Sequence, residues 1–307
     1  MQMTNVIINF RRHLKRRNFS QSTVKYYLNI IKQYVIWLDV ALEEATPGKV
    51  HLYVDHLLRK RMHPASINLY LAVVRIFYDY LKHEEHVNLI NPVKGNYRLR
   101  SPRPLPRSLR DQEVEKLFNM IKNKRDFAMF RLMLRCGLRV EEVAHLTLRD
   151  IDFKSNRIMV RQGKGGKDRV VYISKDAHDA LAAYLKQRSR HRAKGVFLVE
   201  KGTYKGRAIS VRGIQKRIEF YAKKTRIEVS CHRLRHTMAT QLLNAEAEIE
   251  TIQDLLGHNW ITTTQRYCKV SNLKVQRDYF KAMQKVMERS EKSVTSDVGE
   301  KLGIIRF

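Results

Sequence analysis

The sequence predicts a mainly α-helical protein with one small antiparallel β-sheet, an α+β chain of two domains. Apolar residues in the first hundred positions recur at steps of three and four, which is the period of an amphipathic helix. Two short alternating stretches around a glycine-rich segment, within residues 157–173, predict the sheet. Four of the six prolines lie between residues 92 and 106, and a chain of 307 residues is long enough for a domain on each side of them.

Residues 1–98 are expected to form a bundle of four helices. The clearest helix carries one continuous apolar stripe, made by Val24, Leu28, Ile31, Val35 and Leu38. Ser20 or Ser22 is the candidate N-cap of this helix, and Thr46, which precedes a proline, caps the next one. His63 precedes a third helix, and a weaker fourth is expected near the N-terminus. Short connections between such helices favour a compact bundle.

A linker is expected at residues 99–108, where prolines alternate with arginines and favour a stiff, extended connection. The second domain is expected over residues 109–290. It begins with several helices and continues through the hairpin, a short strand at 196–198 and further helices to a last helix at 271–289. Residues 291–307 form a polar tail whose role the sequence does not decide.

Charge is the strongest global property of the chain. Sixty Lys and Arg residues oppose thirty Asp and Glu residues, for a formal net charge of +30. The basic residues are spread over the whole length and interleaved with aromatic residues, which favours a polyanionic partner, and nucleic acid above all. A membrane-surface protein would need an amphipathic basic helix with an apolar anchor, and no anchor is evident.

The three cysteines are an odd number and form no disulfide framework, which is typical of a reducing compartment. The chain holds no run of eighteen apolar residues, and its N-terminus lacks the features of a secretion signal. A cytoplasmic protein associated with the nucleoid is therefore expected.

The residues that point to chemistry are concentrated between Cys231 and Lys269. His232 and Arg235 lie one helical turn apart, and His258 and Tyr267 follow in the same stretch. An arginine fork matches a phosphate group, and histidine transfers protons near neutral pH. A tyrosine can act as a nucleophile when a base or a positive field activates it. Together these residue types suit attack on a phosphodiester.

A zinc site is the rival interpretation of the same stretch. Its candidate ligands are Cys231, His232, His236, His258 and Cys268. His232 and His236 have the spacing of an HExxH zinc helix, but the residue after the first histidine is arginine, and Arg235 would place a fixed cation beside the metal. No metal, nucleotide or other cofactor is therefore expected, and His236 is interpreted as structural.

The stretch HRLRHTMAT, followed by LLGH and by Tyr267 nine residues after that histidine, resembles the signature of the tyrosine recombinase family (phage integrases and Xer-like proteins). Earlier in the chain, CGLRVEEVAHLTLRDID resembles the family's first arginine motif, and GKGGKDR resembles its GKGxKxR hairpin. The resemblance extends over nearly the whole chain, with its specific motifs confined to residues 136–267.

The resemblance implies a role for each matched residue. Tyr267 would attack the scissile phosphate, Arg139 and Arg235 would hold its non-bridging oxygens, His232 would accept the phenol proton or stabilise the phosphate, and His258 would donate a further hydrogen bond. Lys164 would protonate the leaving 5′ oxygen, with Lys167 as the next candidate for this role. Glu142 would support the site through hydrogen bonds. For Glu142, a surface carboxylate without a role is an equal alternative.

The resemblance further implies a site-specific DNA recombinase that works through a 3′-phosphotyrosine intermediate, in integration, excision or resolution. Residues 1–98 would be its core-binding domain on duplex DNA, and residues 109–290 its catalytic domain. A homotetramer is expected in the synaptic complex, with an accessory recombinase or directionality factor as a further candidate partner. Two alternatives remain open: a type IB topoisomerase-like nicking-closing enzyme and a DNA-binding regulator without catalysis.

Overall fold

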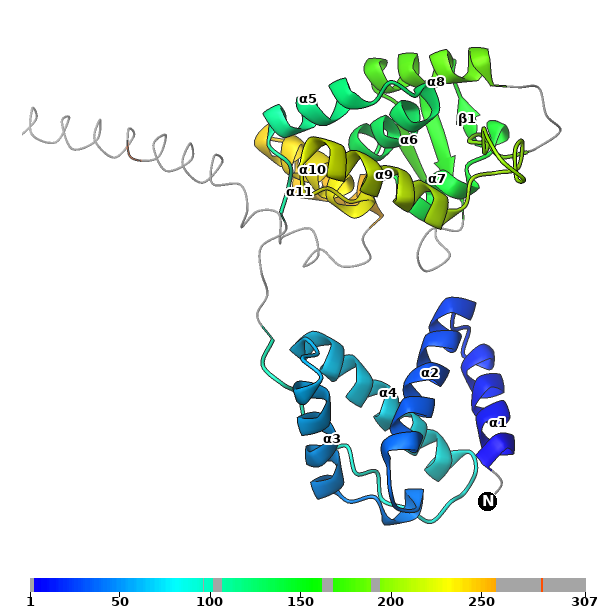
Figure 1. Cartoon of the computed structure of the whole chain (residues 1–307), viewed down its shortest axis with the longest axis vertical. Coiled ribbons are helices and arrows are strands. Elements are labelled where there is room, and N and C mark those ends of the chain that lie inside the picture. Colours follow the sequence, from blue (N-terminus) through cyan, green and yellow to red (C-terminus); the bar gives the residue numbers. More distant parts are fainter. Residues whose placement is uncertain are drawn as a thin grey trace, which may run out of the picture. The chain divides into compact units, whose positions relative to one another are not determined.

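In the computed structural model (Figure 1), the described residues are 3–95, 97–101, 107–161, 168–188 and 194–257, together with Met283. The chain divides into two compact units, Met1–Arg103 and Pro104–Phe307. The division falls inside the segment that the sequence predicts as a linker. Each unit has its own apolar core, so each is described by itself.

The first unit is a bundle of four helices. They are α1 (Met3–Arg16), α2 (Gln21–Trp37), α3 (Pro47–Arg59) and α4 (Pro64–His83), with a 3-10 turn η1 at Leu42–Glu44. The long helix α4 packs against both α2 and α3, and α1 packs against α2 (Figure 1). The four expected helices are therefore all present in this unit.

The predicted caps account for where these helices begin. Ser20 is the N-cap of α2, and its Oγ accepts a hydrogen bond from the backbone N–H of Thr23 at 3.2 Å. The Oγ1 of Thr46 caps α3 in the same way, and the Nδ1 of His63 accepts from the N–H of the second residue of α4. A cap satisfies one of the backbone donors that a helix leaves without a partner at its start.

The chain that follows α4 returns along the same helix. The side chain of Asn68 accepts from the backbone N–H of Leu99 at 2.8 Å and donates to its carbonyl at 2.9 Å. Arg75 donates to the carbonyl of Gly95, and the ring of Tyr97 stacks on a histidine of α3. These contacts fix residues up to 99 on the first unit, which places the start of the connecting segment on this unit.

The second unit is mainly helical and contains one three-stranded sheet. Its helices are α5 (Asp111–Met120), α6 (Lys124–Arg135), α7 (Val140–His145), α8 (Lys175–Gln187), α9 (Val211–Thr225), α10 (Cys231–Asn244) and α11 (Ile249–Leu256), with a 3-10 turn η2 at Leu148–Asp150. The strands β1 (Ile151–Asp152), β2 (Arg157–Val160) and β3 (Arg169–Tyr172) run antiparallel in the order β1-β2-β3. The expected hairpin strands correspond to β2 and β3, whose register pairs Val160 with Arg169.

Helix α6 lies at the centre of this unit and packs against α8 and α10 (Figure 1). Its side chains Ala128, Met129, Phe130, Leu132, Met133 and Leu134 are buried. A helix that is apolar on nearly every side is stable only where other elements surround it.

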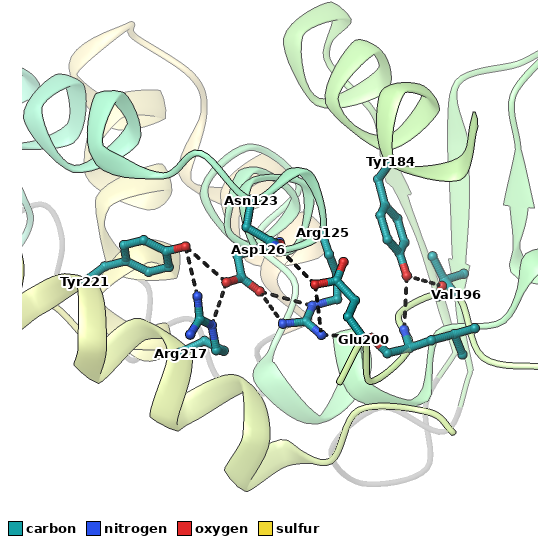
Figure 2. Close-up of polar contacts among 9 residues, drawn as sticks. Asn123, Arg125, Asp126, Tyr184, Val196, Glu200, Arg217 and Tyr221 are labelled. Carbon is teal, nitrogen blue, oxygen red and sulfur yellow. Dashed lines mark hydrogen bonds and ion pairs between the residues drawn. The ribbon is translucent and has the colours of Figure 1, made fainter. Parts of the chain in front are cut away.

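A buried ionic network fixes the start of α6 (Figure 2). Asp126 is fully buried, and its carboxylate accepts from Arg125 at 2.8 Å, from Arg217 at 2.6 Å and from the Tyr221 hydroxyl at 3.1 Å. Arg125 also donates to the carbonyl of Leu198. The network therefore connects α6 to α9 and to the segment before α9.

The expected strand at 196–198 does not form a ladder. The structure has only isolated bridges here, between Thr147 and Gly195 and between Leu198 and Ala208. Single backbone hydrogen bonds hold this segment instead, since the N–H of Val196 donates to the carbonyl of Leu146 at 2.8 Å and the N–H of Ile209 donates to the carbonyl of Phe197 at 2.9 Å. The hydroxyl of Tyr184 also accepts from the N–H of Leu198 at 3.1 Å. The expected helix at 271–289 and the tail lie outside the described residues, apart from Met283.

Candidate functional site

Arg139 is placed by the break between α6 and α7. Gly137 has φ +64°, and a Cβ there would lie 2.9 Å from the Sδ of Met238, so a glycine is required at this turn. Arg139 is the N-cap residue of α7. Its guanidinium donates to Glu142 through Nη1 at 2.8 Å and to the carbonyl of Gly257 through Nη2 at 3.1 Å. Among the described residues, Glu142 and Gly257 thus take two of the five N–H groups that a guanidinium offers.

Glu142 is the acidic centre of the cluster. Its Oε1 accepts from Nη1 of Arg139 and from Nη1 of Arg169 at 2.7 Å, and its Oε2 accepts from the backbone N–H of Arg139 at 2.7 Å and from Nη2 of Arg169 at 2.8 Å. Burial alone would raise the pKa of this carboxyl, but the Arg169 and Arg139 contacts outweigh it and lower the pKa to about 2. Glu142 is therefore a buried carboxylate that holds two arginines, and not a surface residue without a role.

Arg235 is the most deeply buried cation of the site. It lies on α10, the expected helix, and only 2% of the residue is exposed. Its guanidinium donates to the carbonyls of Gly137 and Leu256. Arg235 thus connects the turn that precedes Arg139 to the end of α11.

Three consecutive carbonyls at the end of α11 each accept from a different arginine. Leu255 accepts from Arg169, Leu256 from Arg235, and Gly257 from Arg139. The last carbonyls of a helix carry partial negative charge, so cations are favourable there. These contacts bring the chain segments of Arg139, Arg169 and Arg235, which are far apart in the sequence, to the end of α11.

Gly257 ends α11 in the left-handed conformation, with φ 59° and ψ 54°. A Cβ at this position would lie 2.9 Å from the Cδ of Arg169, so the close approach of the arginine requires glycine here. The helix itself is held by a small apolar cluster with α10, which lies beside it in Figure 1 and which includes Met238, Leu243, Ile252 and Leu256. The predicted C-cap is confirmed.

His232 lies in the first turn of α10 and is exposed, one turn before the buried Arg235. Its ring meets the ring of His236 edge to face, with 4.1 Å between the centroids. Ser230 caps the helix by accepting from the N–H of Arg233. The exposed imidazole is therefore accessible to a ligand from solvent.

Three predicted site residues lie outside the described residues: Lys164, His258 and Tyr267. His258 directly follows Gly257, and Lys164 precedes Arg169 by five positions in the sequence. Two of the three therefore adjoin, along the chain, residues that the arginine cluster fixes.

Sequence reasoning missed the part that Arg169 plays. The residue is the last letter of the hairpin motif GKGGKDR, which resembles the pattern GKGxKxR, so the signal was present without a role attached to it. In the structure its side chain is only 10% exposed and it contacts both Glu142 and Leu255.

Other candidate chemistry is sparse in the part of the chain that the structure describes. Within it, no three His, Cys, Asp or Glu side chains gather as a metal site. Cys136 and Cys231 are buried, and burial raises the pKa of each thiol to about 12. Among these same residues, no helix has the length and apolar character needed to cross a membrane.

Two protein-family profiles match the chain. The phage integrase family matches residues 107–274, and the N-terminal SAM-like domain of phage integrases matches residues 7–87. The tyrosine recombinase XerA of Thermococcus kodakarensis is 32% identical over 286 residues, which cover 92% of this chain and 97% of XerA. The tyrosine recombinase XerC of Staphylococcus aureus is 30% identical over 286 residues, covering 90% and 95%.

Solved structures share the fold. A crystal structure of XerA recombinase is 27% identical, with a TM-score of 0.53, and the match covers 91% of this chain and 98% of that one. The Tn1549 transposon integrase in complex with transposon right end DNA has a TM-score of 0.73 at 17% identity, covering 91% and 99%. The second match shows the fold alone, and it confirms the mainly α architecture with a small antiparallel sheet.

Proposed function

Because this chain belongs to the phage integrase family of tyrosine recombinases, we propose that it cleaves and rejoins DNA at specific sites with Tyr267 as its nucleophile. The phenolic oxygen attacks the scissile phosphorus, and the bond from phosphorus to the 5′ oxygen breaks. A 3′-phosphotyrosine and a 5′ hydroxyl result. The phosphodiester energy is kept in the new ester, and a second attack by a 5′ hydroxyl releases the tyrosine and reseals the strand.

The observation that carries this proposal is the meeting of Arg139 and Arg235 at the end of α11. Their guanidinium groups reach adjacent carbonyls, of Gly257 and Leu256, so both cations lie beside the residue that leads to His258. Charge that builds on the non-bridging oxygens of a phosphate is stabilised most by donors already held in place. Both guanidinium groups are held in place here by hydrogen bonds to the backbone.

The remaining roles follow the chemistry of each group. His232, exposed at the start of α10, accepts the phenol proton or donates to the phosphate. Lys164 gives a proton to the departing 5′ oxygen, and His258 donates a hydrogen bond to the phosphate. Glu142 fixes Arg139 by hydrogen bonds to both its backbone and its side chain.

The assembly belongs to the same proposal. A solved λ integrase of this fold is a tetramer bound to a Holliday junction. We expect this chain to form a tetramer on two DNA sites, where residues 1–98 bind the duplex, residues 109–290 cleave it, and an accessory recombinase or directionality factor sets the direction. The net charge of +30 favours association with nucleoid DNA in the cytoplasm.

The test is the capture of covalent protein–DNA adducts on labelled duplexes. The wild-type chain should give an adduct that survives SDS, and the adduct should retain a label placed at the 5′ end of the cleaved strand, because the tyrosine is joined to the 3′ end at the break. Tyr267→Phe should bind the same DNA without forming the adduct, whereas the control Tyr204→Phe, at an exposed tyrosine of the same unit, should form it normally. Adduct from Tyr267→Phe at the wild-type yield would overturn the assignment.

Strand exchange separates a recombinase from a nicking-closing enzyme. Two duplexes with different labels are incubated with the chain, and the products are tested for strands that carry both labels. Joined strands support recombination. Relaxation of a supercoiled plasmid without any joined strand would contradict it.

A further inference from the structure

Arg169 is a nearly buried cation to which none of the proposed chemical steps gives a role. It opens β3, and each of its three guanidinium nitrogens donates to a partner. Nη1 and Nη2 form a two-pronged pair with the carboxylate of Glu142 at 2.7 and 2.8 Å, and Nε donates to the carbonyl of Leu255 at 3.0 Å. Such a pair fixes orientation as well as charge.

We propose that Arg169 is a positioning residue for DNA cleavage, a proposal that rests on the function proposed above. Arg169 does not touch the phosphate. It acts through Glu142 on the direction of Arg139, and through the carbonyl of Leu255 on the end of α11.

The first effect follows from how the Glu142 carboxylate is shared. Each carboxylate oxygen of Glu142 accepts one hydrogen bond from Arg169 and one from Arg139. The bond from Arg139 to Oε1 comes from Nη1, whereas the bond to Oε2 comes from the backbone N–H. A single guanidinium nitrogen of Arg139 therefore donates to Glu142. Without Arg169, both oxygens would be open to a two-pronged pair with the Arg139 side chain. That pair would turn the guanidinium toward Glu142 and would neutralise the cation that is meant for the phosphate.

The second effect follows from the packing of Arg169 on the end of α11. A Cβ at Gly257 would come within 2.9 Å of the Cδ of Arg169, within 3.3 Å of its Nε and within 3.5 Å of its Nη1. The side chain therefore covers the glycine that precedes His258, and its bond to Leu255 holds the preceding turn. Arg169 also begins the strand that follows Lys164, so one side chain ties the chain segments of three proposed catalytic groups.

A lysine cannot reproduce this arrangement. The guanidinium presents three nitrogens in a plane, matched here by two carboxylate oxygens and one carbonyl, whereas an ammonium is a point charge that cannot span them. Arg169→Lys keeps the positive charge but cannot make the three hydrogen bonds together, so this variant separates the effect of geometry from the effect of charge. The matched control is Arg157→Lys, at the opposite end of the β2–β3 pair, where the arginine is exposed and contacts an exposed aspartate.

The experiment measures single-turnover cleavage by the full-length chain on a duplex with a normal scissile phosphate and on one with a methylphosphonate at that position. The replacement exchanges one non-bridging oxygen for a methyl group and removes the negative charge that Arg139 and Arg235 would stabilise. Because a small misplacement of a catalytic group can cost up to about 100-fold in rate, Arg169→Lys should cleave the phosphate about 10- to 100-fold more slowly than wild type, with DNA binding within about twofold. On the methylphosphonate duplex, Arg169→Lys should cleave only a few-fold more slowly than wild type. Arg157→Lys should cleave both duplexes at the wild-type rate.

The rate constant and the amplitude separate the outcomes. A fraction of unfolded variant lowers the amplitude on both substrates but leaves the rate constant unchanged, so a loss confined to amplitude overturns the proposal. An equal slowing on both substrates also overturns it, because Arg169 would then not act through the phosphate clamp. If the wild-type chain forms no adduct with Tyr267, the proposed function itself fails. If the wild type cleaves and Arg169→Lys cleaves equally fast, only the positioning role of Arg169 fails.

Discussion

Neutralising Glu142 should destabilise the second unit by an amount that depends on pH. The pKa of this carboxyl is lowered from its ordinary value of 4.5 to about 2 in the folded chain, and its side chain is only 8% exposed. The difference of about 2.5 between the two pKa values corresponds to about 3 kcal/mol of stability at pH 7. Glu142→Gln keeps the shape and loses the charge, so it should lower the free energy of unfolding by about this amount.

The direction with pH follows from the lowered pKa. Because the folded chain holds Glu142 ionised more strongly than the unfolded chain does, its contribution is complete above about pH 5 and is lost as the pH falls toward 2. The difference between wild type and Glu142→Gln should therefore shrink from about 3 kcal/mol at pH 7 to about 1.5 kcal/mol at pH 3. Taking this difference cancels the titration of every other group that the two proteins share.

Urea unfolding followed by circular dichroism, at pH 7 and pH 3, measures both values. The matched control is Glu141→Gln, the neighbouring and exposed carboxylate of the same helix turn, which should leave the midpoint nearly unchanged. A gap of the same size at both pH values would refute the reasoning, because the loss would then come from packing and not from the charge. No gap at pH 7 would refute the ion pairs as a source of stability.

Three further changes test other parts of the structure. Asp126→Asn leaves the buried charge of Arg125 without its main partner, which should cost about 3 kcal/mol of stability. Calorimetry should show the melting temperature of the second unit fall by roughly 6–12 °C, and an unchanged melting temperature would count against the network. Gly257→Ala puts an alanine in the left-handed conformation, which costs about 1–2 kcal/mol of stability, and brings its Cβ into a clash with Arg169. Adduct formation should therefore fall while DNA binding in a gel-shift assay is kept, and full cleavage activity would contradict the packing. Ser20→Ala removes the cap of α2 and should destabilise the first unit by about 1 kcal/mol in urea unfolding, with cleavage by the second unit's residues unaffected once DNA is bound.

Much of the fold was predictable because its signals are local. The apolar stripe from Val24 to Leu38 and the caps at Ser20 and Thr46 lie within a few residues of the helices they specify, and the structure has those helices. The glycine at 257 likewise predicted the end of α11. The prediction of a strand at 196–198 was wrong, because three apolar residues do not determine whether a neighbouring backbone pairs with them along a ladder.

The sequence by itself determined which residue types are available for phosphate chemistry, because motifs such as HRLRH and GKGGKDR can be recognised from their letters and spacing. It also determined the need for an anionic partner, since net charge does not depend on folding. Only the tertiary structure decided that Arg139, Arg169 and Arg235 donate to three consecutive carbonyls at the end of α11. Those contacts join side chains to backbone groups far away in the chain, and neither periodicity nor propensity along a sequence records which distant segment a guanidinium will reach.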